Sequence, residues 1–145
     1  MADKYGNFNG ADAGAPAFLA AAAGGADFLW FPSPARDYVE QGIDLNDYCI
    51  RHPAATYLVQ AAGDSMINAG IYPGDLLVVD RSLEASHGRI VIACVNGEMT
   101  CKRLELHPEV RLVAENSHYA PLVPGEGTSL EIFGVVTSVV RRLVP

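Results

Sequence analysis

The sequence is short of positive charge. It has 10 Lys and Arg residues against 17 Asp and Glu residues, which gives a formal net charge of −7 at pH 7. The basic residues are scattered, apart from the pair Arg141 and Arg142. Proteins that bind nucleic acid directly neutralise phosphates with clustered Lys and Arg side chains. The composition therefore argues against direct nucleic-acid binding and favours action through protein partners.

Cysteine is also scarce, and no cofactor or metal signature is present. The three cysteines, Cys49, Cys94 and Cys101, have no paired C-x-x-C spacing, so neither a disulfide framework nor a zinc site is predicted. We expect reduced, buried thiols in a cytoplasmic protein. No glycine-rich phosphate loop occurs, and no cofactor is predicted. The four histidines lie at predicted turns without ligand spacing; they are His52, His87, His107 and His118.

No apolar run approaches the ~18 to 20 residues that cross a membrane as a helix. Residues 16–31 are rich in Ala and weakly apolar, but they lack a basic leading segment and are interrupted by Gly24, Gly25 and Asp27. We therefore do not interpret them as a signal peptide. A membrane anchor is not predicted.

The chain divides by composition into residues 1–30 and 31–145. The first part is dominated by Ala and Gly, with too little bulky apolar surface to offset the entropy of ordering, and we expect a flexible arm. Two apolar clusters, 18–19 and 28–31, are exceptions. They either anchor the arm or enter a site as substrate, and both interpretations stay open. Phe31-Pro32-Ser33-Pro34 predicts an extended hinge before a single domain.

The sequence pattern of residues 31–145 predicts a mainly β domain. A short helix is expected from Asp44, which suits the N-cap position. Frequent turn signals separate short apolar or alternating segments, which favours an antiparallel fold with a closed or folded-over sheet. The predicted strands are Tyr57–Ala62, Leu76–Asp80, Arg89–Val95, Glu98–Leu106, Val110–Ala114 and Leu130–Val140.

Ser65 stands at a tight turn, Gly63-Asp64-Ser65-Met66, between an apolar segment and a short turn of helix. A serine at such a corner can present its hydroxyl outward with backbone N–H groups around it, as a nucleophile and oxyanion hole require. Most serines in such turns only satisfy the local backbone. The turn alone therefore leaves both interpretations open.

Lys102 adds a second candidate group. The Asn96-Gly97 pair between two alternating runs predicts a hairpin. Alternation along the returning strand puts Lys102 on a face with Leu104 and Leu106. Such a lysine either extends its amine to water or is desolvated, and desolvation lowers its pKa and makes it a possible general base. Alternation turns Cys101 to the opposite face, so a catalytic cysteine is not expected.

Several motifs from Phe31 to the C-terminal end resemble a known family. They include Phe31-Pro32-Ser33-Pro34-Ala35, Gly63-Asp64-Ser65-Met66, Gly74-Asp75-Leu76-Leu77, Ser86-His87-Gly88 and Phe133-Gly134-Val135-Val136. Together they are similar to UmuD-like SOS mutagenesis proteins, which belong with LexA to a family of self-cleaving serine peptidases. The resemblance implies a folded-over antiparallel sheet or partial barrel, with a flexible arm and one short helix.

The resemblance also implies roles. Ser65 matches the nucleophile and Lys102 the general base. With that pair in place, the backbone N–H groups of the turn formed by Asp64, Ser65 and Met66 would form the oxyanion hole. It further implies a homodimer, self-cleavage in the arm triggered by a RecA–single-stranded DNA filament, and a shortened product that serves a Y-family, UmuC-like DNA polymerase. If Lys102 titrates above neutrality in the uncut chain, unassisted cleavage is expected to be faster in alkali.

The sequence departs from the family at the bond to be cut. UmuD-like proteins cut between Cys or Ala and Gly just ahead of the Phe-Pro-Ser-Pro motif, where this chain has Leu29 and Trp30. Bulk beside the scissile carbonyl would crowd the attack. The nearest Ala-Gly bond is Ala23-Gly24, which is the favoured site, with Leu29-Trp30 as the alternative. A dimeric interaction module with an inactive Ser/Lys pair is the second functional hypothesis.

Overall fold

The computed structural model describes residues 42–145. The chain forms two units, Met1–Tyr48 and Cys49–Pro145, of which the first is described only from residue 42. The arm and both candidate cleavage bonds therefore lie outside the described residues. Helix α2 (Leu45–Cys49) follows Asp44, whose Oδ1 accepts a hydrogen bond from the Asn46 N–H at 2.9 Å. This is the predicted N-cap.

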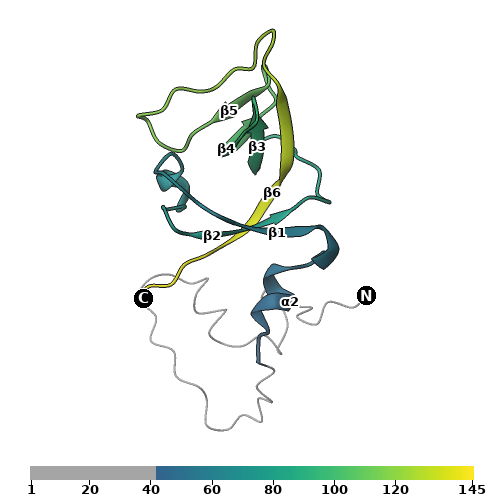
Figure 1. Ribbon diagram of the computed structural model, residues 1–145, viewed down its shortest axis with the longest axis vertical. Helices are drawn as coiled ribbons and strands as arrows, with labels where there is room; N and C mark the ends of the chain where they lie inside the picture. The colour runs from purple at the N-terminus through teal and green to yellow at the C-terminus, as the bar shows by residue number, and fades with distance from the viewer. Residues whose placement is uncertain (1–41) are drawn as a thin grey trace. The chain divides into compact units, whose positions relative to one another are not determined.

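The second unit is built on one antiparallel sheet (Figure 1). Its strand order is β1-β2-β6-β3-β4-β5, which leaves β1 and β5 as the edges of an open sheet. The prediction of a mainly antiparallel β fold is confirmed, and the bounds of β2 and β6 are those expected. The strands are β1 (Thr56–Gln60), β2 (Leu76–Asp80), β3 (Ile90–Val95), β4 (Glu98–Glu105), β5 (Arg111–Val113) and β6 (Leu130–Val140).

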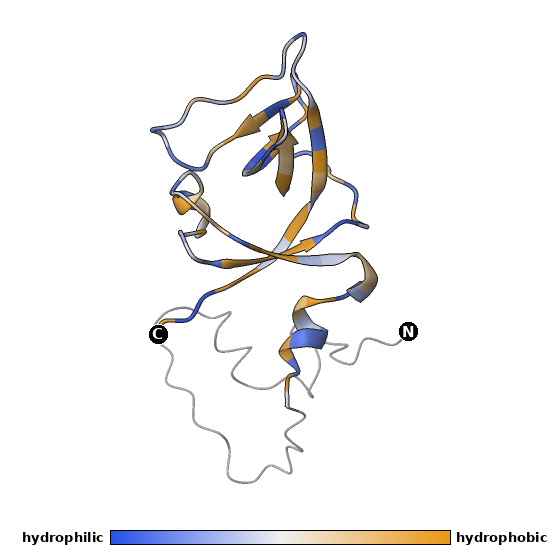
Figure 2. Cartoon of the chain, in the orientation of Figure 1, coloured by the Kyte–Doolittle hydropathy of each residue, from blue (hydrophilic) through white to orange (hydrophobic). Residues whose placement is uncertain are grey.

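The core consists of two apolar clusters, and β3 contributes to both. Ile92 belongs to the first cluster, whereas Val91 and Ala93 belong to the second. Successive residues of a strand point to opposite faces, so β3 is buried on both faces. Its unbroken apolar run is therefore explained by burial on both sides. Apolar residues are concentrated on the strands, and the connecting loops are mostly hydrophilic (Figure 2).

Strand β6 links the two clusters through a change of phase. Phe133 packs on the first cluster, and strict alternation would put Val135, two residues further on, on the same face. Instead Val135 belongs to the second cluster, together with Ile132, and Val136 packs on the first. The register with β3 shifts at this point, where Ile92 pairs with Gly134 and Ala93 pairs with Ile132. A β-bulge adds one residue and reverses the alternation beyond it.

Gly134→Ala is expected to destabilise the domain by about 1–3 kcal/mol, as overpacking does in other cores. An added Cβ would lie 2.7 Å from Val79 Cγ1 and 3.1 Å from the Asp80 carbonyl oxygen. Val79 is fully buried, so a contact this short forces a shift within the packed core. Urea unfolding measures the loss, with Gly125→Ala as the control because nothing lies within 4 Å of its added Cβ. Equal stability of the two variants would contradict the close packing at Gly134.

Candidate active site

Ser65 lies in the turn that follows β1 and leads into the 3-10 helix η2 (Ile67–Ala69). Gly63 has a φ of 73°, in the left-handed region that glycine adopts without strain. On the other side of Ser65, Met66 is 3% exposed and belongs to the first core cluster. Ser65 itself is partly buried. The turn therefore holds Ser65 next to a buried anchor.

The structure brings Lys102 to Ser65. The Asn96-Gly97 hairpin forms as predicted, with both residues at positive φ, and its register places Val91 opposite Lys102. Lys102 Nζ lies 3.0 Å from Ser65 Oγ, 2.8 Å from Thr100 Oγ1 and 3.0 Å from the Cys101 carbonyl oxygen. Thr100 and Lys102 share a face of β4 because they are two residues apart.

Burial lowers the pKa of the Lys102 amine from its ordinary value of 10.5. The charge of the neighbouring Cys101 acts in the opposite direction, but burial is the larger effect. Among residues 42–145 no carboxylate forms an ion pair with this amine. A neutral amine has two N–H donors and one lone pair. Thr100 Oγ1 and the Cys101 carbonyl can accept the two donors, which leaves the lone pair for the Ser65 hydroxyl proton. These contacts suit a general base.

The backbone around Ser65 has unused donors. The N–H groups of Asp64, Ser65 and Met66 donate no hydrogen bond to any residue in the described part of the chain. Backbone N–H groups of this kind stabilise an oxyanion when they converge on the position where it forms. The three positions are those that the sequence predicted as an oxyanion hole.

Sequence reasoning missed the segment that holds this turn. Asn116 Nδ2 donates to the Asp64 carbonyl oxygen at 3.0 Å, and the Tyr119 hydroxyl donates to Asp64 Oδ1. The Asn68 N–H donates to the Glu115 carbonyl oxygen at 2.9 Å. In the sequence, residues 116–119 give only a turn signal. The two contacts of Asp64 join positions 52 and 55 residues apart, which no local pattern reveals.

A second missed contact holds the turn before β2. Asp75 is 1% exposed, and Arg141 donates to its two carboxylate oxygens from Nε and Nη2, each at 2.6 Å. The Tyr72 N–H also donates to Asp75 Oδ2 at 2.8 Å. The hydrogen bonds from Arg141 hold the pKa of Asp75 below its usual value despite burial. This pair ties the end of β6 to the turn between η2 and β2.

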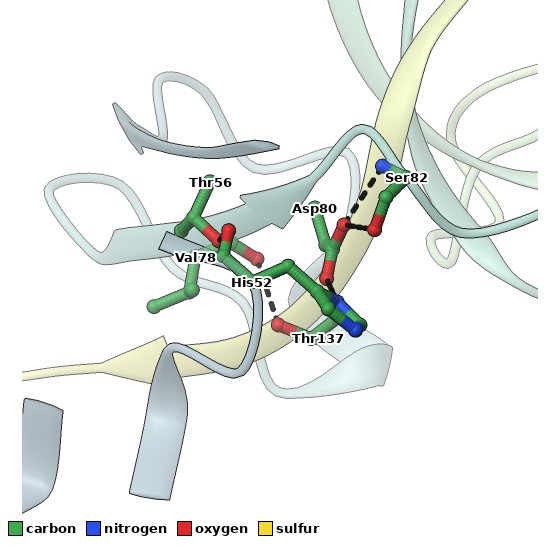
Figure 3. Close-up of polar contacts among 6 residues, drawn as sticks. All are labelled: His52, Thr56, Val78, Asp80, Ser82 and Thr137. Carbon is green, nitrogen blue, oxygen red and sulfur yellow. Dashed lines mark hydrogen bonds and ion pairs between the residues drawn. The ribbon is translucent and has the colours of Figure 1, made fainter. Parts of the chain in front are cut away.

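A cluster of His52, Asp80 and Ser82 contains the residue types of a catalytic triad but not its geometry (Figure 3). His52 Nδ1 lies 2.6 Å from Asp80 Oδ2, and Ser82 Oγ donates to Asp80 Oδ1 at 2.6 Å. In a triad the histidine lies between the serine and the acid. Here the acid lies between the other two, so His52 does not accept the Ser82 proton.

The electrostatics of this cluster fit a structural role. Burial alone would raise the pKa of Asp80, but hydrogen bonds from Ser82 and His52 outweigh it, and the pKa lies below its usual value. The Thr56 hydroxyl donates to the His52 carbonyl oxygen at 2.7 Å, which fixes the start of β1 (Figure 3). The cluster joins the end of β2 to the segment that precedes β1. Sequence analysis had placed His52 only at a turn.

The cysteines are free thiols, as expected, but all three are only partly buried. The sequence predicts buried thiols, and the structure corrects this to partial burial. Burial raises the pKa of Cys101 to about 11. Since the thiolate is the reactive form, Cys101 is a poor nucleophile at neutral pH.

Two kinds of feature are absent from residues 42–145. Over this part of the chain no helix is both long and apolar enough to cross a membrane. No group of three or more His, Cys, Asp or Glu side chains within it is placed to hold a metal ion.

Comparison with known proteins identifies the class. The profile of the Peptidase S24-like family matches residues 16–137. Protein SamA of Salmonella typhimurium is 52% identical over 112 residues, which cover 77% of this chain and 78% of SamA. Protein MucA of Escherichia coli is 49% identical over 108 residues, covering 74% of each chain.

A repressor is also similar to this chain. The LexA repressor of Shewanella denitrificans is 41% identical over 113 residues, which cover 77% of this chain and 55% of the repressor. These matches place the chain in the class of S24-like domains, which are generally serine peptidases. The chain belongs to the S24 peptidase family, and the resemblance to UmuD-like SOS mutagenesis proteins is confirmed.

Proposed function

We propose that this chain is a self-cleaving serine endopeptidase of the SOS response. Ser65 is the nucleophile, Lys102 the general base, and a bond in residues 1–30 the substrate. The observation that carries the proposal is the 3.0 Å distance between Lys102 Nζ and Ser65 Oγ, with an amine whose pKa is lowered by burial. Membership of the S24 family supports the same chemistry.

The reaction proceeds through an acyl-enzyme. The Ser65 hydroxyl proton passes to the Lys102 lone pair as Ser65 Oγ bonds to the peptide carbonyl carbon. Backbone N–H groups of Asp64, Ser65 and Met66 stabilise the oxyanion. The C–N bond then breaks, and the Lys102 ammonium gives its proton to the leaving amine. Water, deprotonated by Lys102, releases the ester as a carboxylate and restores Ser65.

We propose that the C-terminal fragment left after cleavage is the active product and that it acts as a homodimer. Its partner would be a Y-family, UmuC-like DNA polymerase, and a RecA–single-stranded DNA filament would trigger the cleavage. The similarity to UmuD-like proteins supports these partners, and the net charge of −7 favours protein partners over direct DNA contact. A trigger acts by stabilising a docked arm that is otherwise rarely populated.

The intact mass of the purified full chain over time tests the proposal. We expect fragments to accumulate at alkaline pH, and at neutral pH when a RecA–single-stranded DNA filament is added. Fragment masses distinguish Ala23-Gly24, the proposed bond, from Leu29-Trp30. The chain with Ser65→Ala is the control, and it should stay intact. An intact wild-type chain under every condition would refute the peptidase proposal.

Trp30 favours a second candidate. It stands where the family has glycine beside the bond to be cut, so the substrate fits less well than the Ser/Lys pair. The alternative is a dimeric interaction module that binds a polymerase partner without cleavage. Binding of the partner that is equal for the wild type and for Ser65→Ala, with no cleavage in either, would favour this alternative.

A further inference from the structure

We propose that Asn116 is a positioning residue that orients the Asp64–Ser65 peptide, so that the Ser65 N–H faces the oxyanion. This inference rests on the proposed function. Asn116 does not touch the reacting atoms. It acts through the carbonyl group of Asp64, whose peptide unit carries the N–H of the nucleophile.

The geometry begins with the Asp64 carbonyl oxygen. It accepts hydrogen bonds from Asn116 Nδ2 at 3.0 Å and from the Ile67 N–H at 3.4 Å. The peptide unit is planar and trans, so its C=O and N–H groups point in opposite directions. When Asn116 holds the Asp64 carbonyl oxygen, the Ser65 N–H must point away from Asn116. That N–H donates to no residue in the described part of the chain.

Asn116 itself has one favoured orientation. It is 7% exposed, and its Oδ1 accepts a hydrogen bond from the His118 N–H at 3.0 Å while its Nδ2 is used on Asp64. An amide with a donor and an acceptor both engaged cannot flip without losing both bonds. The side chain is therefore a fixed donor toward the turn.

Without Asn116, the Asp64 carbonyl oxygen keeps, among residues 42–145, only the longer bond from Ile67. The peptide can then rotate about its flanking single bonds and carry the Ser65 N–H away from the oxyanion. Loss of one oxyanion donor costs about 10²–10³-fold in rate in other serine peptidases. Partial loss of its orientation is expected to slow the reaction by at least about tenfold.

The test compares Asn116→Ala and Asn116→Asp with the wild-type full chain. Asn116→Asp keeps an acceptor for the His118 N–H but, as a carboxylate, has no donor for Asp64. Asn96→Gly is the matched control. Asn96 lies in the β3–β4 turn, and its Oδ1 accepts a hydrogen bond from the Ser129 N–H at 3.0 Å, so this variant also removes a side-chain amide that is hydrogen-bonded to the backbone. Self-cleavage in alkali and the rate at which a fluorophosphonate labels Ser65 are measured over a range of pH.

Both Asn116 variants are expected to cleave and label at least about tenfold more slowly, and Asn96→Gly to match the wild type. For Asn116→Ala the midpoint of the pH–rate profile should not move, because Lys102 keeps its contacts. Asn116→Asp adds a carboxylate, whose negative charge favours the ammonium form of Lys102, so its midpoint is not used in the test. Rates are compared below the unfolding temperature of each variant, so that a lower rate of cleavage or labelling is not caused by unfolding. Unchanged rates in both variants, or a lower rate of Asn116→Ala with a shifted midpoint, would overturn the role of Asn116.

Labelling separates this inference from the proposed function. A wild-type chain that cleaves, with Asn116 variants that cleave equally fast, overturns the inference alone. A wild-type chain that is labelled but never cleaves refutes self-cleavage, and slower labelling of the variants still supports Asn116. A wild-type chain that neither cleaves nor is labelled overturns both.

Discussion

Ser65→Ala is expected to abolish self-cleavage, and Lys102→Ala to slow it by about 10²–10⁴-fold. Ser65→Ala removes the oxygen that forms the acyl-enzyme. Lys102→Ala removes the only amine within hydrogen-bond distance of that oxygen among the described residues. The measurement is the first-order rate of fragment formation at alkaline pH, read by intact mass, with circular dichroism to show that each variant is folded.

Lys102→Arg is the informative control for this prediction. A guanidinium keeps the positive charge and the length of the side chain, but it stays protonated at every accessible pH and cannot accept a proton. We therefore expect Lys102→Arg to be about as slow as Lys102→Ala. Cleavage by Lys102→Arg at the wild-type rate would show that charge or packing, and not a neutral amine, is what the site needs.

Much of the fold follows from local sequence patterns. Residues 76–80 and 130–140 were expected as strands and form β2 and β6 with those bounds, because apolar runs between turn residues need no distant information. The order of the strands in the sheet, in contrast, does not follow from local patterns. Strand β6 lies between β2 and β3, far from both in the sequence. Alternation specifies which face is buried, but it does not specify the neighbouring strand.

Some features of the candidate site likewise follow from the local sequence, and others depend on distant contacts. The Ser65 turn and the face of Lys102 follow from glycine, alternation and the family resemblance, and the structure brings the two side chains together. The contacts of Asn116 with Asp64 and of Arg141 with Asp75 could not be predicted. Asn116 looks like any turn residue and Arg141 like any terminal charge until the fold brings them to their partners.

The rate of unassisted cleavage is expected to rise about tenfold per pH unit below the pKa of Lys102 and to level off above it. The sign follows from burial, which disfavours the ammonium form and lowers the pKa from 10.5. The neutral fraction, which alone can accept the Ser65 proton, therefore grows as pH rises. The midpoint of the profile should lie below 10.5.

Rates of fragment formation across neutral and alkaline pH measure this profile, and labelling of Ser65 by a fluorophosphonate gives it without the arm as substrate. The two profiles should share one midpoint if Lys102 controls both, because the base acts on Ser65 before any substrate-specific step. Lys102→Arg should have no such midpoint, since arginine does not titrate in this range. A wild-type rate that is flat with pH, or that falls in alkali while the chain is folded, would rule out a neutral lysine as the base.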